Sequence, residues 1–77
     1  MMGYLINILY HNATTKEFKE LDLDYDWREL DVVPFLLLNF HGAHPVWNNE
    51  IEYTEIYIGG SSIITLMTFE EFQNMIL

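Results

Sequence analysis

Residues 50–67 read EIEYTEIYIGGSSIITLM, and this stretch decides the fold. Two segments rich in β-branched and aromatic residues, 50–58 and 61–67, are separated by Gly59 and Gly60. Such segments favour strands, and a two-residue hairpin turn favours glycine because its central positions need positive φ. The stretch therefore predicts an antiparallel β-hairpin.

The residues that follow predict a short C-terminal helix. Thr68 and Glu71 have the spacing of a capping box, in which each side chain binds the backbone N–H of the other residue. Phe69, Phe72 and Ile76 recur at helical spacing and form one apolar stripe. We expect this stripe to pack on one face of the sheet.

The N-terminal part of the chain predicts two further strands. Residues 4–11 are apolar on both faces, which favours a strand in the interior of the sheet. Residues 12–15 are polar and predict a turn. Over 21–27, apolar and acidic residues alternate, and this period of two predicts a second strand that pairs with the first.

The middle of the chain gives weaker signals. Asp26 and Glu29 have capping-box spacing, which predicts a short helical turn directly after Asp26. After Pro34, residues 35–40 fit either a buried strand or a second helical turn, and periodicity does not separate the two. Residues 41–49 are rich in Gly, Pro and Asn and predict a connecting loop.

Together these elements predict a single acidic α+β domain over residues 1–77. It would contain a small, mainly antiparallel sheet of four or five strands, with the C-terminal helix packed on one face. A chain of 77 residues has room for only one core, because it buries about 60 to 65% of the surface that its unfolded form exposes. The chain has no cysteine, so packing and hydrogen bonds must hold this core without disulfides.

The net charge of the chain limits the kinds of molecule that it is expected to bind. Twelve acidic residues stand against three basic ones, which gives a net charge of −9. Such a surface repels phosphate backbones and anionic lipids, so we expect a basic protein surface as partner, and neither nucleic acid nor membrane. The sequence shows no signal peptide and no run of the roughly 20 apolar residues that a membrane helix needs, so we expect a cytoplasmic protein.

Seven of the twelve acids fall within fifteen residues, and we call them the acidic belt: Glu17, Glu20, Asp22, Asp24, Asp26, Glu29 and Asp31. On the predicted strand, Asp22, Asp24 and Asp26 would project from one face about 6.6 Å apart, as charges repeat along a nucleic-acid backbone. The apolar residues between them would then point into the core: Leu21, Leu23, Tyr25 and Trp27. We hypothesise that the belt binds a partner, the alternative being the solvated outer face of an edge strand.

The sequence predicts no metal or cofactor. The row that starts at Asp22 begins like a calcium loop, but Trp27 occupies the position of the required glycine and Val33 that of the bidentate glutamate. His41 and His44 have no spacing that demands a zinc site. The row could still bind calcium or magnesium weakly and adventitiously.

Two other features have a functional and a structural interpretation. Trp47, in the predicted 41–49 loop, either folds over the core or is displayed as a contact anchor for a partner, a role in which tryptophan is enriched. Ser61 and Ser62 lie at the hairpin turn, outside the strand–turn–helix setting of a hydrolase nucleophile, and no glycine pattern marks a phosphate loop. We therefore do not expect an enzyme.

The leading hypothesis is an inhibitor or antidote that blocks the basic cleft of a nucleic-acid-handling enzyme. In size and charge alone, the chain resembles nuclease immunity proteins and the small proteins, anti-CRISPR proteins among them, that phages use against host defence or repair enzymes, some of which imitate DNA charge. No motif assigns the chain to one such family. The alternative is a structural or assembly module that oligomerises through an apolar sheet surface, for which an unpaired strand edge would offer a homodimer interface.

Overall fold

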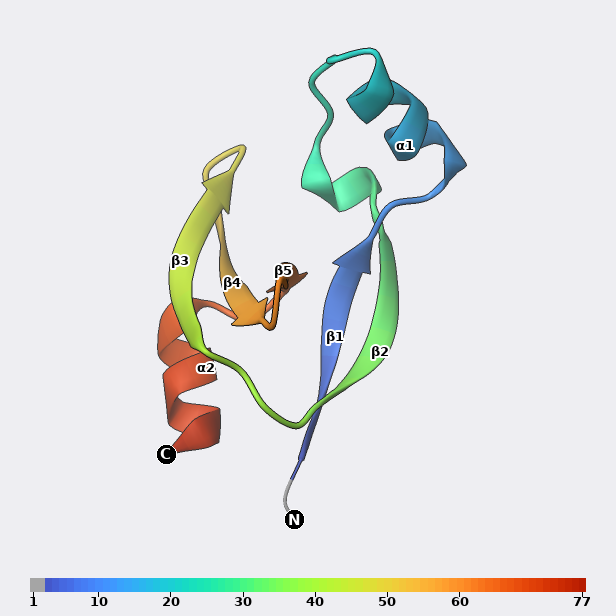
Figure 1. Ribbon diagram of the computed structural model, residues 1–77. Coiled ribbons are helices and arrows are strands. Elements are labelled where there is room, and N and C mark those ends of the chain that lie inside the picture. Colours follow the sequence, from blue (N-terminus) through green and yellow to red (C-terminus); the bar gives the residue numbers. More distant parts are fainter. Residues whose placement is uncertain (1–2) are drawn as a thin grey trace.

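A computed structural model describes residues 3–77 of the chain, and these form one curved sheet with helices at its ends (Figure 1). The elements in chain order are β1 Tyr4–Tyr10, α1 Ala13–Glu20, the 3₁₀-helix η1 Trp27–Glu29, β2 Asp31–Leu37, β3 Gly42–Asn48, β4 Ile51–Ile58, β5 Ser61–Thr65 and α2 Phe69–Ile76. All neighbouring strands are antiparallel, in the order β2-β1-β5-β4-β3. The predicted α+β fold with a C-terminal helix is therefore confirmed.

The predicted hairpin is formed by β4 and β5, which pair from Thr54↔Thr65 to Ile58↔Ser61. Gly59 has φ +57°, a left-handed conformation that favours glycine. Gly60 does not have a positive φ, so only one of the two turn positions needs a glycine for this reason.

The C-terminal helix α2 begins at its predicted cap. The Thr68 hydroxyl accepts a hydrogen bond from the Glu71 N–H at 3.2 Å, and the Glu71 carboxylate accepts one from the Thr68 N–H at 2.8 Å. Glu52 of β4 also accepts a hydrogen bond from the Phe69 N–H at 2.7 Å, which ties the first turn of α2 to the sheet. From the apolar stripe, Phe72 is buried in the core and makes an edge-on contact with Phe40.

Strand β1 lies between β2 and β5, as the apolar character of both of its faces predicted. Its seven residues all pair with β2, whereas its contact with β5 is a single pair, Ile8↔Thr65. The Thr65 hydroxyl strengthens this junction by donating to the Asn7 carbonyl at 2.8 Å. The core spans the junction and consists of Ile6, Ile8, Leu37, Ile56 and Phe72.

The sheet is curved, and a short connection shows why. Strands β2 and β3 are the two edges of the sheet, yet they are consecutive in the chain. Five residue steps, from Leu37 to Gly42, span at most about 18 Å, whereas a flat five-stranded sheet would separate its edges by about 19 Å. The sheet must therefore curl, and Figure 1 shows β2 and β3 facing each other across the connection.

The turn predicted at 12–15 is instead the start of helix α1. The Asn12 side chain accepts a hydrogen bond from the Thr15 N–H at 2.9 Å, and the Thr15 hydroxyl accepts one from the Asn12 N–H at 3.0 Å. This is a capping box with threonine at its third helical position, where glutamate or glutamine is the usual residue. The Asn12 amide also donates to the Glu29 carbonyl at 2.8 Å, which joins α1 to η1.

The strand predicted over 21–27 is wrong. Leu21 is the C-cap of α1, Asp22 has φ +58°, and no strand follows before β2. Leu21 and Leu23 are 62% and 51% exposed, so they do not enter the core as predicted. The physical reason is that the segment starts at the end of α1 and that Asp22 takes a left-handed conformation there, which interrupts the extended backbone that a strand needs.

The remaining predictions concern the middle of the chain, which contains the two edge strands, β2 and β3. The helical turn after Asp26 is confirmed as η1. Of the segment after Pro34, residues 35–37 belong to strand β2 and residues 38–40 to the connection that follows it. The loop predicted at 41–49 is wrong, since strand β3 covers most of it. Its Gly and Pro residues are tolerated because β3 is an edge strand. The turn itself consists of Asn49 and Glu50, which both have positive φ.

Within residues 3–77, neither α-helix is long and apolar enough to cross a membrane.

Candidate functional site

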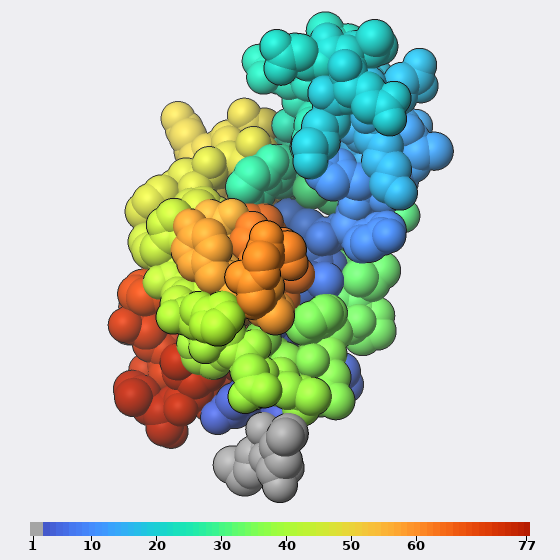
Figure 2. Space-filling model, viewed as in Figure 1, coloured from blue at the N-terminus to red at the C-terminus, as the bar shows by residue number. Residues whose placement is uncertain are grey.

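The acidic belt lies at one end of an elongated molecule. The molecule measures 40 × 24 × 20 Å along its principal axes, and Figure 2 shows α1 and the loop after it as a projection from this end. Six of the seven belt residues are exposed, and their carboxylates make no hydrogen bond or ion pair within the described chain: Glu17, Glu20, Asp22, Asp24, Glu29 and Asp31. The belt is therefore a surface of uncompensated negative charge.

The predicted regular line of charge is not present. Asp22 lies in a turn with positive φ, Asp24 in an extended loop, and Asp26 at the start of η1. A spacing of about 6.6 Å along one face requires a strand, and this segment is not one. The acids share an end of the molecule, but they do not form a straight row.

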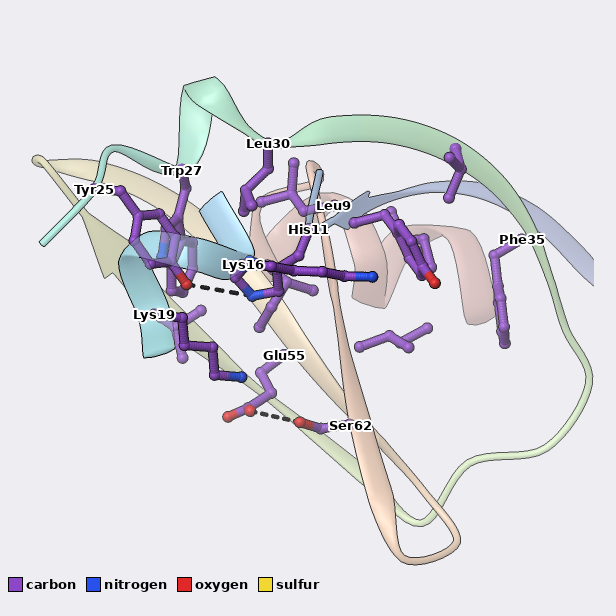
Figure 3. Close-up of a pocket in the computed structure, with 16 residues that line it drawn as sticks. Leu9, His11, Lys16, Lys19, Tyr25, Trp27, Leu30, Phe35, Glu55 and Ser62 are labelled. Atoms are coloured by element: carbon purple, nitrogen blue, oxygen red, sulfur yellow. Dashed lines mark hydrogen bonds between the residues drawn. The ribbon is translucent and has the colours of Figure 1, made fainter. Parts of the chain in front are cut away.

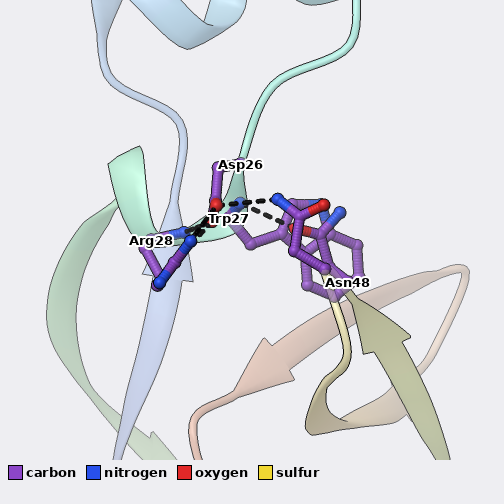
Figure 4. Close-up of polar contacts among 5 residues, drawn as sticks. Asp26, Trp27, Arg28 and Asn48 are labelled. Atoms are coloured by element: carbon purple, nitrogen blue, oxygen red, sulfur yellow. Dashed lines mark hydrogen bonds and ion pairs between the residues drawn. The ribbon is translucent and has the colours of Figure 1, made fainter.

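Asp26 differs from the rest of the belt because its carboxylate is fully engaged (Figure 4). It accepts hydrogen bonds from the Arg28 backbone N–H at 2.8 Å and from the Arg28 guanidinium at 2.6 Å. It also accepts one from the Asn49 amide at 2.7 Å. The hydrogen bonds from Arg28 hold the pKa of Asp26 well below its usual range. Asp26 therefore fixes the loop to the β3–β4 turn and is not free for a partner.

A second contact anchors the same loop to the sheet. The Trp27 backbone N–H donates to the Asn48 side chain at 2.9 Å, and the Trp27 ring packs on Tyr53 with a centroid distance of 5.2 Å. Tyr53 is buried under this ring, and burial raises its pKa. The end of the belt loop is thus held on the β3–β4 hairpin, by residues that sequence patterns did not connect to it.

Trp47 is displayed on the surface, 61% exposed, on edge strand β3. The interpretation in which it folds over the core is therefore wrong. Because side chains alternate along a strand, Trp47 points to the face of β3 opposite that of Asn48, which binds the belt loop. Belt and Trp47 lie at the same end of β3 but on different faces of it.

Helix α1 contains two acids and two lysines within residues 16–20. Glu17 and Glu20 belong to the belt and do not line the cavity described below. Lys16 and Lys19, three residues apart, line that cavity, and Lys16 is also one helical turn from Glu20. No ion pair joins the lysines to the acids of α1 in the described residues. The lysines therefore leave the belt uncompensated.

The cavity is lined by residues of α1, η1 and all five strands, and it has a volume of about 730 Å³ (Figure 3). Lys16 also lies over the Tyr10 ring, 5.5 Å from its centroid. The Tyr25 hydroxyl is within hydrogen-bond distance of His11 Nε2, at 3.2 Å, whereas the buried His11 Nδ1 has no partner. The sequence signal for this site was the pair of lysines three residues apart, but it becomes visible only when 13–20 is recognised as a helix.

A polar cluster crosses strands β3, β4 and β5. The Glu55 carboxylate accepts a hydrogen bond from Ser62 at 2.8 Å, and it lies 2.7 Å from His44 Nε2. These bonds, that from His44 first, lower the pKa of Glu55. Tyr57 completes the cluster through its hydroxyl, 2.9 Å from His44 Nε2. Ser62 donates to the carboxylate and not to the imidazole, so the histidine is not placed to activate it as a nucleophile.

Within residues 3–77, no three or more His, Asp or Glu side chains are arranged to hold a metal ion. Neither the Asp22 row nor the histidines converge on a common point in this part of the chain.

Comparison of the chain with protein-family models, with curated proteins and with solved structures gave no match, so its function rests on the geometry of its own residues.

Proposed function

We propose that the chain is a protein-binding inhibitor or antidote, whose acidic belt covers the basic cleft of a nucleic-acid-handling enzyme. The observation that carries this proposal is the set of six exposed belt acids without a side-chain partner, gathered at one projecting end. Like charges in this arrangement repel one another, which costs stability in the free chain. A surface rich in Arg and Lys would relieve that repulsion and would be steered to the belt during association.

The two anchors of the belt loop support the same interpretation. Asp26 and Trp27 hold the loop on the β3–β4 turn, so the belt acids are presented from a fixed base. A preorganised surface loses less conformational entropy on binding. Charge mimicry of DNA would then depend on the density of acids at this end, since they do not form a regular row.

This proposal places the action in the cytoplasm, against the enzymes that nuclease immunity proteins and phage anti-defence proteins block. Trp47 supplies a candidate apolar anchor beside the charged surface. A partner that touches both must reach around the edge strand β3, because the belt loop binds the opposite face of that strand.

The test is affinity capture from a lysate of the source cell at low and high salt, with two charge-matched variants alongside. Asp22→Asn combined with Asp24→Asn removes two belt charges that have no partner in the structure. Glu70→Gln combined with Glu71→Gln removes two charges from α2 and keeps its cap, because glutamine also serves in a capping box. Each variant lowers the negative charge equally, so only the position differs.

We expect the wild type and the α2 variant to retain one nucleic-acid-handling enzyme, to release it at high salt, and to inhibit it when purified. The belt variant should bind about fivefold more weakly, if each charge pair supplies about 0.5 kcal/mol. Trp47→Ala should leave stability within about 0.5 kcal/mol because the side chain is exposed, yet weaken binding if it is an anchor. Equal binding by the belt and α2 variants would remove the belt from the interface.

A second candidate function, assembly through an apolar sheet surface, is favoured by the outer face of β1 and β2. Leu5, Val32 and Leu36 are 74%, 51% and 56% exposed, and the register places Leu5 opposite Leu36. Exposed apolar side chains grouped on a sheet are typical of interfaces.

Sedimentation of the wild type and of Leu36→Asp separates the two functions. Assembly predicts an oligomer that persists or strengthens in high salt and that Leu36→Asp dissociates. A wild type that remains monomeric at every concentration would contradict assembly and leave the inhibitor proposal unaffected.

A further inference from the structure

The cavity under α1 collects most of the positive charge of a strongly negative chain. Three Lys and Arg residues occur among the 77, and two of them, Lys16 and Lys19, line this one cavity. The third, Arg28, is paired with Asp26 outside it. Within the described residues neither lysine is paired with an acid, although Glu20 lies one helical turn from Lys16. Their placement indicates a local preference for an anion in the cavity.

The wall beside the lysines contains a polar atom without a partner. His11 lines the cavity, and its Nδ1 is buried without any hydrogen bond, although its Nε2 is close to the Tyr25 hydroxyl. A buried polar atom without a partner is costly and is uncommon in folded proteins. This atom adds to the polar groups near the lysines, although it has almost no surface exposed to the cavity.

Most of the remaining lining is apolar or aromatic. It includes the rings of Tyr10, Trp27 and Phe35 and the side chains of Leu30, Val46 and Ile64. A volume of about 730 Å³ lies within the range of small-molecule sites, which are mostly apolar with a few placed polar groups. The cavity has this composition.

Glu55 limits where a ligand can place its charge. Its carboxylate lines the cavity and is held by Ser62, His44 and Tyr57, and Figure 3 shows the hydrogen bond from Ser62. A second negative charge beside this carboxylate would be repelled. The ligand should therefore place its charge at the lysines and present an uncharged part to Glu55.

We propose that the cavity binds a small organic anion, whose charged group is held by Lys16 and Lys19 and whose apolar body lies against Trp27, Leu30 and Ile64. This site is separate from the acidic belt, because none of the belt acids lines the cavity. The inference does not depend on the inhibitor proposal, and either can fail alone.

The experiment uses two fluorescent probes of the same shape. One is 1-anilinonaphthalene-8-sulfonate, which carries a single negative charge, and the other is its uncharged parent, N-phenyl-1-naphthylamine. Both are titrated at 0.15 M salt, where charges more than about 8 Å away are screened. Benzoate and phenyl phosphate are then added as competitors, to tell a carboxylate head group from a phosphate.

Three variants that each remove one positive charge give the matched comparison: Lys16→Gln, Lys19→Gln and Arg28→Gln. All three side chains are exposed, so the fold should survive, which circular dichroism and melting curves check. We expect Lys16→Gln and Lys19→Gln each to weaken binding of the sulfonate about threefold or more, and Arg28→Gln to change it less than about twofold. The uncharged probe should bind about tenfold more weakly than the sulfonate.

A measurement on the wild type keeps the inference testable if a variant misfolds. Amide shifts on addition of the sulfonate should change around Lys16, Lys19 and Trp27. Displacement by benzoate or by phenyl phosphate supports the site and identifies its head group, whereas displacement by neither overturns it. Equal effects of the three variants, or shifts centred on Leu5 and Leu36, would also overturn it.

Discussion

At the residue scale, His11 makes the stability of the chain depend on pH. Burial, and then the charges of Lys19 and Lys16, lower the pKa of His11 below its ordinary value of 6.5. Between the folded and the unfolded pKa, the unfolded chain binds more protons than the folded one, so acidification favours unfolding. We therefore expect the free energy of unfolding to fall as the pH drops from 7.5 to 6.0.

Urea unfolding of the wild type and of His11→Gln at the two pH values measures this contribution. Glutamine does not titrate, and His41 and His44 remain in both proteins, so the difference between the two pH dependences belongs to His11. The variant should lose less stability than the wild type over this interval. Equal losses would show that His11 does not carry the effect.

Individual residues also show which contacts a local sequence pattern can predict. The capping box of Thr68 and Glu71 was predictable because its partners are three residues apart. Asp26 was predicted to form a capping box with Glu29, but its side chain caps η1 by accepting the N–H of Arg28, two residues on. Its bond to Asn49 crosses 23 residues, and no local pattern indicates which asparagine an aspartate will meet. The sequence thus placed Asp26 in the belt but did not predict that it fixes the loop to the β3–β4 turn.

At the scale of one element, the β4–β5 turn needs glycine at one position and not at the other. Gly59 has φ +57°, where a side chain is unfavourable, whereas Gly60 does not have a positive φ. A Cβ added at either position would meet nothing within 4 Å, so crowding plays no part. Gly59→Ala should lower the free energy of unfolding by about 1–2 kcal/mol, and Gly60→Ala by less than about 0.5 kcal/mol.

Chemical denaturation of the two variants measures these changes in the free energy of unfolding. The two variants are matched controls for each other, because the same substitution is made at two neighbouring positions. Equal destabilisation by the two alanines would show that the conformation of Gly59 is not what the turn depends on.

Elements were predictable where the pattern and the available partner agreed. In β4 and β5, β-branched residues flank a glycine turn, and each strand has the other beside it in the chain. Over 21–27 the alternation was regular, but the segment follows the C-cap of α1 directly, and Asp22 adopts a positive φ there. Strand β3 was missed because Gly42 and Pro45 suit an edge strand as well as a loop. Periodicity describes one segment alone, whereas its conformation also depends on the elements next to it in the chain and on its position in the sheet.

At the scale of the whole molecule, the candidate site follows from an arrangement that composition alone could not give. The charge of −9 indicated an acidic surface, and the structure gathers six unpartnered acids at one end. The cavity, in contrast, is lined by residues of α1, η1 and all five strands, which are distant from one another in the sequence. In the sequence its two lysines look like ordinary helix residues, and only the fold shows that they line the same cavity as His11 and Trp27.

The two edges of the sheet each contain one of the two prolines of the chain, Pro34 in β2 and Pro45 in β3. Proline has no N–H to donate to an added strand, and edge prolines are one means by which sheets avoid pairing with other chains. The edges are therefore poor dimer interfaces, and any assembly should use the apolar face of β1 and β2. We expect the combined variant Pro34→Thr and Pro45→Thr to associate at lower concentrations than the wild type.

Sedimentation over one concentration series, at low and high salt, tests this role of the prolines. High salt matters because the net charge of −9 opposes association of any kind, and screening removes that barrier from both proteins. Leu36→Asp added to the proline variant separates the surfaces, since this side chain lies on the face of β2 and leaves its edge unchanged. Association that survives Leu36→Asp would be through the edges that the prolines block.

The contrary outcome is that the proline variant and the wild type sediment alike at every concentration. The curvature of the sheet, and not its prolines, would then protect the edges, because a curved edge strand is a poor template for a straight strand.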